Sequence, residues 1–315
     1  MGAPPPTCRS CGTALPRAAL FCPKCSHPVF TFTGRRARRL KDASLIGLAG
    51  SLIMALQSAC MLVGGVIALA ALNLAVGGDL SGAERVVGTA AIFVGLTLLF
   101  DLVGISMLAI AFYFHSRAAR ASSAFGGAPD PERKSLAFQG FLAMVFLLLW
   151  ILVTLAWRGA LAALVSFYPT PLGIDLNGVG AADLRRAASI MLALWVAAAI
   201  LLFVGTVFGT RFLQRARAAP LKVTYLFWPF ETALHAGAAL GIALLAQDLL
   251  SRPRFEVSTL GLVQTLGVLD LVIVPVLGLL AYVFLFREFF GMFREVRPAA
   301  PPAPTTSPAD PPGEG

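Results

Sequence analysis

Apolar residues run in long blocks along most of this chain, and few charged residues interrupt them. A helix crosses the roughly 30 Å hydrocarbon core of a bilayer with about 20 apolar residues. Backbone polar groups in lipid must find partners inside the protein, and a helix satisfies them within one segment. The blocks therefore predict six membrane-spanning helices, at residues 44–76, 86–114, 136–157, 187–212, 223–250 and 257–286.

Composition agrees with this pattern, since 57% of the 315 residues are hydrophobic and only 13% are charged. Soluble domains carry about 25% charged residues, so the expected fold class is an all-α polytopic membrane protein.

The chain contains no Walker loop, dinucleotide fingerprint, H-E-x-x-H or G-x-S-x-G motif. We therefore do not expect an enzyme. An intramembrane hydrolase, which would have to use His115 or His235, ranks third among the alternatives.

Basic residues gather at alternate ends of the predicted helices. The segment RRARRLK (residues 35–41) precedes the first helix, and further Arg and Lys residues follow the second, fourth and sixth helices. The opposite connections hold fewer, so the positive-inside rule predicts that both termini are cytoplasmic, in a plasma (inner) membrane. Most of the net charge of +9 then serves topology and contact with the lipid bilayer, and a nucleic-acid partner is not expected.

Four of the five cysteines form two Cys-x-x-Cys pairs that are ten residues apart. These predicted metal ligands are Cys8, Cys11, Cys22 and Cys25. Residues 1–43 contain no apolar segment typical of a secretory signal, so we expect thiolates that bind metal in a reducing compartment. Four sulfurs complete the tetrahedral shell of one Zn²⁺ and leave no position for a substrate, which predicts a structural site. A redox dithiol is the alternative, and His27 is not needed as a ligand.

This segment resembles the short zinc-ribbon domains found at the ends of many bacterial proteins, which share Cys-x-x-Cys-Gly, Leu-Pro and Phe-Cys-Pro-x-Cys elements. The matching positions are Cys8, Cys11, Gly12, Leu15, Pro16, Phe21, Cys22, Pro23 and Cys25, whereas Ser26 stands where the family often has Gly. The resemblance covers about 25 of the 315 residues, and the membrane part resembles no family. It implies zinc binding and a contact surface for a cytoplasmic protein partner, but no activity.

The chain thus divides into four parts. In order, they are a zinc ribbon (residues 1–30), a basic juxtamembrane stalk (31–43), a transmembrane domain (44–290) and a Pro-rich tail (298–315). The tail lacks large apolar residues, so we expect it to be disordered. The longest connection, residues 159–186, begins with apolar residues and then contains Pro169 and Pro171, which stop a helix. We expect a partly ordered extracytoplasmic loop there.

Four ionisable residues fall within the predicted membrane helices: Asp101, Glu231, His235 and Asp270. A charge at the bilayer centre costs at least about 2.5 to 3.5 kcal/mol, so each should be neutral, paired or facing water. Glu231 and His235 are four residues apart and share one helix face. Either the four residues converge on a path for protons or cations, or they are separate interhelical hydrogen-bonding groups that fix the register of the helices.

Two functions stay open on these grounds. The coordinatively closed metal site and the missing catalytic motifs favour a non-enzymatic interaction, scaffold or regulatory protein whose ribbon contacts a cytoplasmic partner. The alternative is a small proton- or cation-coupled transporter or channel that uses the four buried ionisable residues. In both cases the metal lets a short segment fold without an apolar core of its own.

Overall fold

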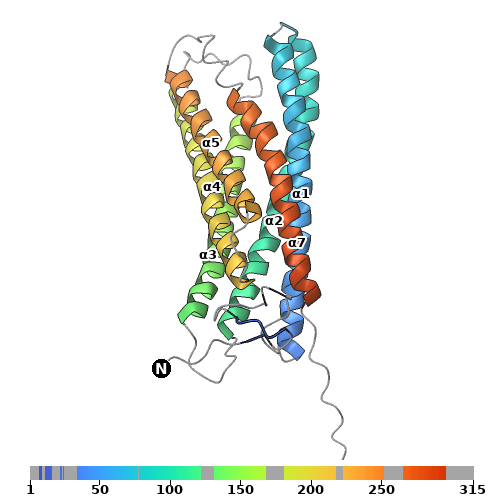
Figure 1. Cartoon of the computed structure of the whole chain (residues 1–315). Helices are drawn as coiled ribbons and strands as arrows, with labels where there is room; N and C mark the ends of the chain where they lie inside the picture. The colour runs from blue at the N-terminus through green and yellow to red at the C-terminus, as the bar shows by residue number, and fades with distance from the viewer. Residues whose placement is uncertain are drawn as a thin grey trace, which may run out of the picture.

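The computed structural model describes residues 7–8, 11–15, 22, 24, 34–76, 78–121, 131–167, 181–217, 223–251 and 265–295. The predicted ligand Cys25 and the Pro-rich tail lie outside these residues. Within them, six long helices form a bundle (Figure 1): α1 (Gly34–Val76), α2 (Leu80–Ala121), α3 (Pro131–Phe167), α4 (Ala181–Ala216), α5 (Phe227–Ser251) and α7 (Val274–Glu295). A 3₁₀ turn, η1 (Val223–Leu226), precedes α5, and a π-helical turn, η2 (Leu269–Ile273), precedes α7.

The bundle confirms the prediction of a multi-pass membrane protein. Six helices are long and apolar enough to cross a bilayer, judged by their length and composition. Most of the helices extend beyond the predicted spans, and two of these extensions change the interpretation. Helix α1 begins at Gly34, so the basic segment at residues 35–41 belongs to its first turns. Helix α3 continues to Phe167, because residues 159–167 contain no proline and are rich in the good helix formers Ala and Leu.

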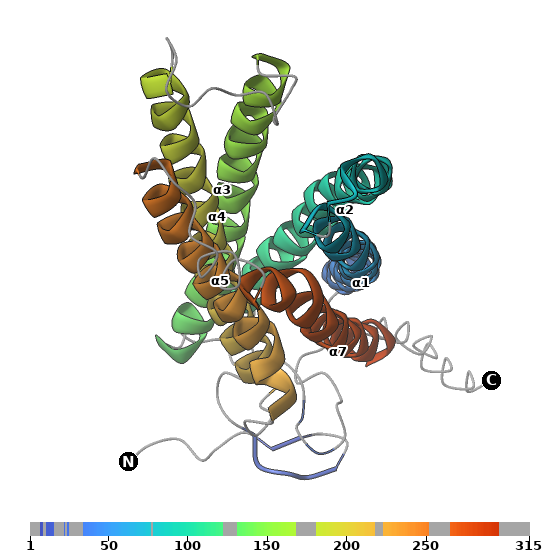
Figure 2. The ribbon, with the colours of Figure 1, turned by 90° about the horizontal axis from the view of Figure 1, so that it is seen from above.

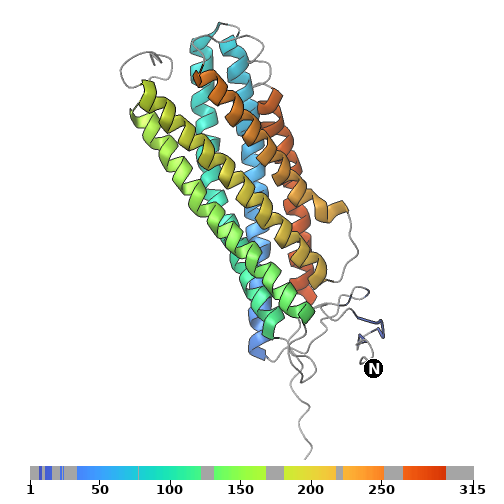
Figure 3. The ribbon, with the colours of Figure 1, turned by 90° about the vertical axis from the view of Figure 1, so that its left-hand side faces the viewer.

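The helices form two groups of three. Helix α1 packs against α2 and α7, whereas α4 packs against α3 and α5. Contacts of α2 with α3 and of α5 with α7 join the two groups. We call the end at which α1 begins and α7 ends the lower end, as in Figure 1, and the opposite end the upper end. The helices meet at the lower end, and the upper ends of α1 and α2 diverge from those of α3 and α4 (Figures 2 and 3).

The buried apolar core lies in the lower half of the bundle. Its members come from residues 40–54 of α1, 105–119 of α2, 136–150 of α3, 198–216 of α4 and 281–292 of α7, with Tyr225 of η1 and Trp228 of α5. Most of each stretch belongs to the half of its helix that is nearer the lower end. Tight packing between the two groups is therefore concentrated at one end of the molecule.

Phe112 of α2 lies at the centre of this core. Its ring contacts those of Phe212 on α4, Trp228 on α5 and Phe289 on α7, with centroid separations of 5.9, 6.2 and 6.1 Å. Edge-to-face and stacked ring pairs each contribute about 0.5 to 1.5 kcal/mol beyond the area that they bury. Because the four rings come from both three-helix groups, they hold the groups together at the lower end.

Gly209 of α4 allows this close approach. A Cβ atom at that position would lie 2.9 Å from the ring of Trp228 and 3.0 Å from the ring of Phe112, closer than side chains normally pack. Gly237, at the start of a Gly-x-x-x-Gly pattern in α5, differs, since a Cβ atom there would meet no heavy atom within 4 Å. Gly241, which ends that pattern, is again close to a neighbour, since its Cβ atom would lie 3.1 Å from Leu266. The pattern alone therefore does not tell which glycine allows close packing.

Candidate functional site

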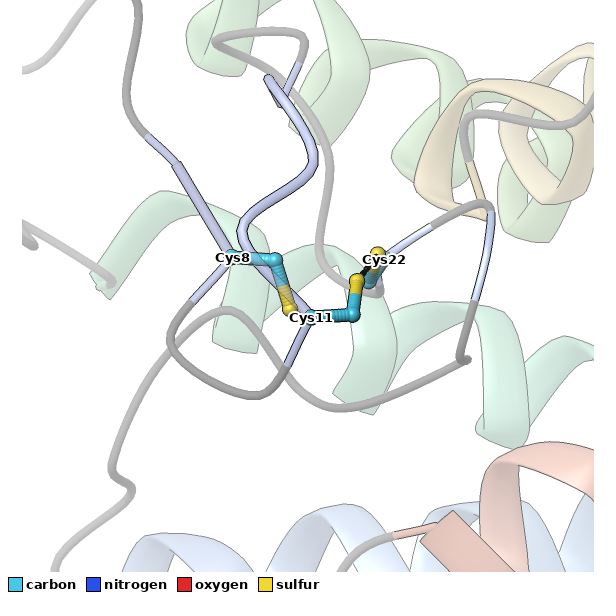
Figure 4. A group of neighbouring side chains, drawn as sticks. All are labelled: Cys8, Cys11 and Cys22. Atoms are coloured by element: carbon cyan, nitrogen blue, oxygen red, sulfur yellow. Dashed lines mark hydrogen bonds between the residues drawn. The ribbon is translucent and has the colours of Figure 1, made fainter.

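The N-terminal cysteines form the first candidate site, and Figure 4 shows Cys8, Cys11 and Cys22 directed toward one another. The backbone folds back after Cys8, since the Gly12 N–H donates to the Cys8 carbonyl at 2.9 Å. Gly12 has a φ of +68°, the left-handed conformation that glycine adopts without strain. This turn brings the first Cys-x-x-Cys pair to one side of the segment, as its spacing predicted.

The sulfur geometry fits a tetrahedral metal ion. The Sγ atoms of the three cysteines lie within 4.8 Å of one another, and those of Cys11 and Cys22 are 3.6 Å apart. Zinc–sulfur bonds of about 2.3 Å at tetrahedral angles place neighbouring sulfurs about 3.8 Å apart. Cys8 and Cys22 are buried and pack with Leu15. The cluster can therefore hold a metal ion, with three of its predicted ligands in the described part of the chain.

Asp101 forms one of the ion pairs between the described helices. It lies near the middle of the 42-residue helix α2, and Nη2 of Arg158 on α3 donates to its Oδ2 at 2.9 Å. The side chain of Asp101 is only 6% exposed and that of Arg158 is 20% exposed. The guanidinium also lies over the ring of Trp157, 5.3 Å from the centroid. The sequence pointed to Asp101 but assigned Arg158 to the charge of an outer connection.

His235 and Asp270 form another of these pairs. Nδ1 of His235 on α5 lies 2.7 Å from Oδ1 of Asp270 in η2, a hydrogen bond in which the ring nitrogen donates. The ring of His235 also meets the ring of Trp195 on α4 edge-on, with centroids 6.3 Å apart. Like the first pair, this one joins the two three-helix groups, because α5 belongs to one group and η2 leads into α7 of the other.

Asp270 lies on a π-helical turn. The Val274 N–H donates to the Leu269 carbonyl five residues earlier, so one extra residue is fitted into this turn. The wider turn lies directly against α1, where a Cβ atom at Gly65 would overlap the carbonyl oxygen of Leu271. Such turns often occur at functional sites. The glycine and the π turn together bring the backbone that carries Asp270 into the bundle.

Glu231 is the remaining predicted residue and the least satisfied. It is 8% exposed, and its Oε2 atom is buried without a hydrogen-bond partner among the residues that the structure describes. Ser58 of α1 and Gly278 of α7 lie beside it. A Cβ atom at Gly278 would be 2.7 Å from the Ser58 hydroxyl and 3.6 Å from Oε1 of Glu231. Three helices thus meet at this carboxyl group with no bulky side chain between them.

The structure brings the four predicted residues together. Glu231 interacts electrostatically with His235, Asp270 and Asp101, and Asp101 also interacts with His235. With Arg158 they form what we call the charged cluster. Its three carboxyl groups face two cationic groups, Arg158 and His235 when it is protonated, so one more positive charge would make the cluster neutral. A groove of about 300 Å³ between α4 and α5 is lined by other, mostly apolar residues.

Two further polar contacts lie nearer the lower end. His115 is buried, and its Nε2 atom lies 3.1 Å from the hydroxyl of Ser44 on α1. Glu288 of α7 accepts hydrogen bonds from Arg217 at 2.7 Å and from the hydroxyl of Tyr225 at 3.2 Å. The sequence did not single out this second group. Both contacts join helices at the end where the apolar core is packed.

No protein-family model, curated protein or solved structure matches this chain. The resemblance of residues 8–25 to zinc ribbons therefore depends on the motif itself, together with the clustering of three N-terminal cysteines. The charged cluster is likewise interpreted from its own geometry.

Proposed function

We propose that the membrane domain conducts protons or cations across the bilayer through the charged cluster. One observation carries this proposal: four ionisable residues, predicted from sequence, lie near one another and Arg158 inside the bundle, and among the described residues of the cluster the carboxyl groups outnumber the cationic groups by one. Buried charges in membrane proteins are costly, and they typically belong to ion paths and proton relays. Interhelical hydrogen bonding alone explains the two ion pairs but gives no reason for Glu231.

The position of the cluster supports the same proposal. The ion pairs lie where the packed core ends: the core begins at Ile105 in α2, directly beyond Asp101, and ends at Trp150 in α3, before Arg158. Below the cluster the two helix groups are joined by aromatic rings, and above it the upper ends of α1 and α2 diverge from those of α3 and α4 (Figure 2). A cluster at such a junction is suited to exchange ions with one side of the membrane while the core blocks the other.

The orientation of the bundle in the membrane follows from the distribution of basic residues. At the lower end, helix termini carry many basic residues, among them Arg38, Lys41, Arg120, Lys134 and Arg294. The positive-inside rule then assigns the lower end to the cytoplasm, together with both termini of the chain. In this orientation the cluster exchanges ions with the extracytoplasmic side, and the aromatic core is the barrier toward the cytoplasm.

The test is ion flux in liposomes that contain the purified protein, followed with dyes sensitive to pH or to cations. Asp101→Asn and Asp270→Asn should each lower the flux at least about tenfold, since that factor corresponds to only about 1.4 kcal/mol of barrier. The matched control is Asp42→Asn, the same substitution at an exposed position near the start of α1. Flux that is unchanged in both cluster variants would contradict the proposal.

A second role is favoured by the clustered cysteines. The sulfurs of Cys8, Cys11 and Cys22 are spaced as ligands of a tetrahedral ion, so we infer a structural zinc ribbon that offers a contact surface to a cytoplasmic protein. Such a ribbon has no open coordination position, which argues for a regulatory or scaffolding part and against a catalytic one. This role is compatible with transport, because the ribbon and the charged cluster are separate.

The ribbon can be tested by its metal content. Cys22→Ser should remove the one bound zinc ion, measured by atomic absorption, because three remaining thiolates bind zinc far more weakly than four. Helical content and membrane insertion should stay at the level of the unmodified protein, since the helices begin at Gly34. Loss of insertion in the Cys22→Ser protein would show that the ribbon is not a separate module. The control is Cys60→Ser, which removes a cysteine within α1.

A further inference from the structure

We propose that the ion carried by the charged cluster is a proton and that Glu231 is the residue that holds it. This inference rests on the proposed function and narrows it, since flux through the cluster would otherwise be open to sodium, potassium or larger cations. The starting observation is geometric: Glu231 is more than nine-tenths buried, and its Oε2 atom has no hydrogen-bond partner among the described residues.

Among the described residues, few side-chain hydroxyl groups lie beside Glu231. Calcium takes about six to eight oxygen ligands in proteins, and some of these can be backbone carbonyls or water. The Ser58 hydroxyl of α1 faces the same point as Oε1 of Glu231 and donates to Oε1 of Gln57 at 3.2 Å. The next hydroxyl along α5, that of Thr232, is 2.8 Å from Thr206. Addition of one proton neutralises Glu231 without any further ligands.

The space around Glu231 also favours a proton. One turn above Glu231 on α5 lies His235, whose ring is engaged in the hydrogen bond to Asp270. The other titratable groups facing Glu231 are Asp270 of η2, Asp101 of α2 and Tyr282 of α7, and Asp101 is paired with Arg158 of α3. Neutralisation of Glu231 by a proton adds no ion that must share the space with these side chains.

His235 provides a path to Glu231. Its Nδ1 atom is used in the hydrogen bond to Asp270, so Nε2 is the nitrogen that can accept and release a proton. His235 is four residues after Glu231, on the same face of α5 and nearer the upper end. Its side chain is 23% exposed, whereas that of Asp270 is 8% exposed. A proton can thus enter at the imidazole and move one helical turn inward to the carboxyl group.

Trp228 marks the end of this path. It lies three residues before Glu231 in α5, is fully buried, and stacks on Phe112 with an interplanar angle of 12°. Its ring also meets that of Tyr282 edge-on, at a centroid separation of 6.3 Å. These rings separate Glu231 from the lower end. The carboxyl group is therefore the innermost ionisable member of the cluster before the aromatic core.

The test uses dicyclohexylcarbodiimide, an apolar reagent that reacts with carboxyl groups only in their protonated form. The full-length protein in liposomes is treated at neutral pH, and the labelled residue is located by mass spectrometry. We expect a label on Glu231, a loss of that label in Glu231→Gln, and none on the exposed residue Asp42. Labelling of the wild-type protein should decline as the pH is raised, a measurement that does not depend on the folding of any variant.

Cation competition decides between the ions. Sodium or potassium chloride at matched ionic strength should leave the labelling of Glu231 unchanged, since neither ion occupies the site. Absence of a label on Glu231, or protection of Glu231 by either cation, would overturn the inference. Cation flux through a protein in which Glu231 is not labelled would overturn the proton inference but would still support the proposed transport function. A labelled Glu231 with no flux in liposomes would support the proton site and overturn the proposed transport instead.

Discussion

The lower and upper halves of the bundle are built from helices of similar composition but are held together differently. In the lower half, the rings around Phe112 and the contacts of Glu288 join the two three-helix groups through closely packed side chains. Farther up, the described contacts between the groups include two ion pairs, Asp101 with Arg158 and His235 with Asp270. The apolar side chains inside a membrane protein are about as apolar as the lipid tails around it. Close packing of side chains therefore decides where membrane helices associate.

This difference separates stability from the candidate function. The buried core lies below the charged residues, so we expect it to stay packed when their pairing is changed. Regions that move in transport are drawn from the less stable parts of a structure. The three predictions below test this division, beginning with the substitution that should cost the most free energy.

The largest effect is expected from the centre of the lower core. Phe112→Ala removes three ring contacts and should lower the free energy of unfolding by about 3 to 5 kcal/mol. Denaturant titration of the purified protein in detergent, followed by circular dichroism, measures this change. Leu152→Ala is the control in the upper part of α3, where the side chain is 62% exposed and the expected change is below about 0.5 kcal/mol. Equal losses would remove the distinction between the halves.

The next effect concerns the ion pair above the core. Asp101→Leu leaves the charge of Arg158 without its partner and should destabilise the protein by about 3 kcal/mol. Replacement of both residues, Asp101→Leu with Arg158→Met, should recover most of this loss, since an apolar pair of similar volume replaces a buried ion pair at little cost. The same titration applied to the two single variants and the double variant gives the coupling energy. Additive losses would show that the pair contributes no coupling energy between α2 and α3.

The smallest effect compares two glycines. Gly209→Ala forces a methyl group against Trp228 and Phe112 and should cost about 1 to 3 kcal/mol. Gly237→Ala meets open space and should be neutral or stabilise the protein by up to about 1 kcal/mol, because alanine favours helix. Thermal unfolding of the two variants side by side is sensitive enough to give the signs. A stabilising Gly209→Ala would mean that α4 is not held closely against α2 and α5.

The helices were predictable because long apolar blocks leave little choice of structure in lipid. Their ends were not. The third helix was ended at residue 157 because Arg158 interrupts the apolar block, yet that arginine is paired with Asp101 and the helix continues to Phe167. A charged residue therefore need not end a helix when it has a partner inside the bundle. The partner here is 57 residues away in the sequence, where local patterns give no signal.

For the candidate site, the sequence predicted which residues take part but not how they pair. The cost of burying charge was enough to single out Asp101, Glu231, His235 and Asp270, all of which fall within the cluster. Their pairing was not predictable, since it depends on how α2 meets α3 and how α5 meets α7. The sequence LDLVI also contains no motif that predicts a π turn. Of the four predicted zinc ligands, Cys8, Cys11 and Cys22 are clustered, as the motif indicated.

The π turn at Leu269–Ile273 has a consequence for how this chain can vary. Each residue advances an α-helix by about 100°, so one residue inserted in a turn rotates everything after it by that angle. The side chain of Asp270 meets His235, and Tyr282 faces the core, with this insertion lying between them. Deletion of a single residue from the turn would put those two positions out of phase. Natural variants that keep the cluster should therefore preserve the length of this segment more strictly than the identity of its apolar residues.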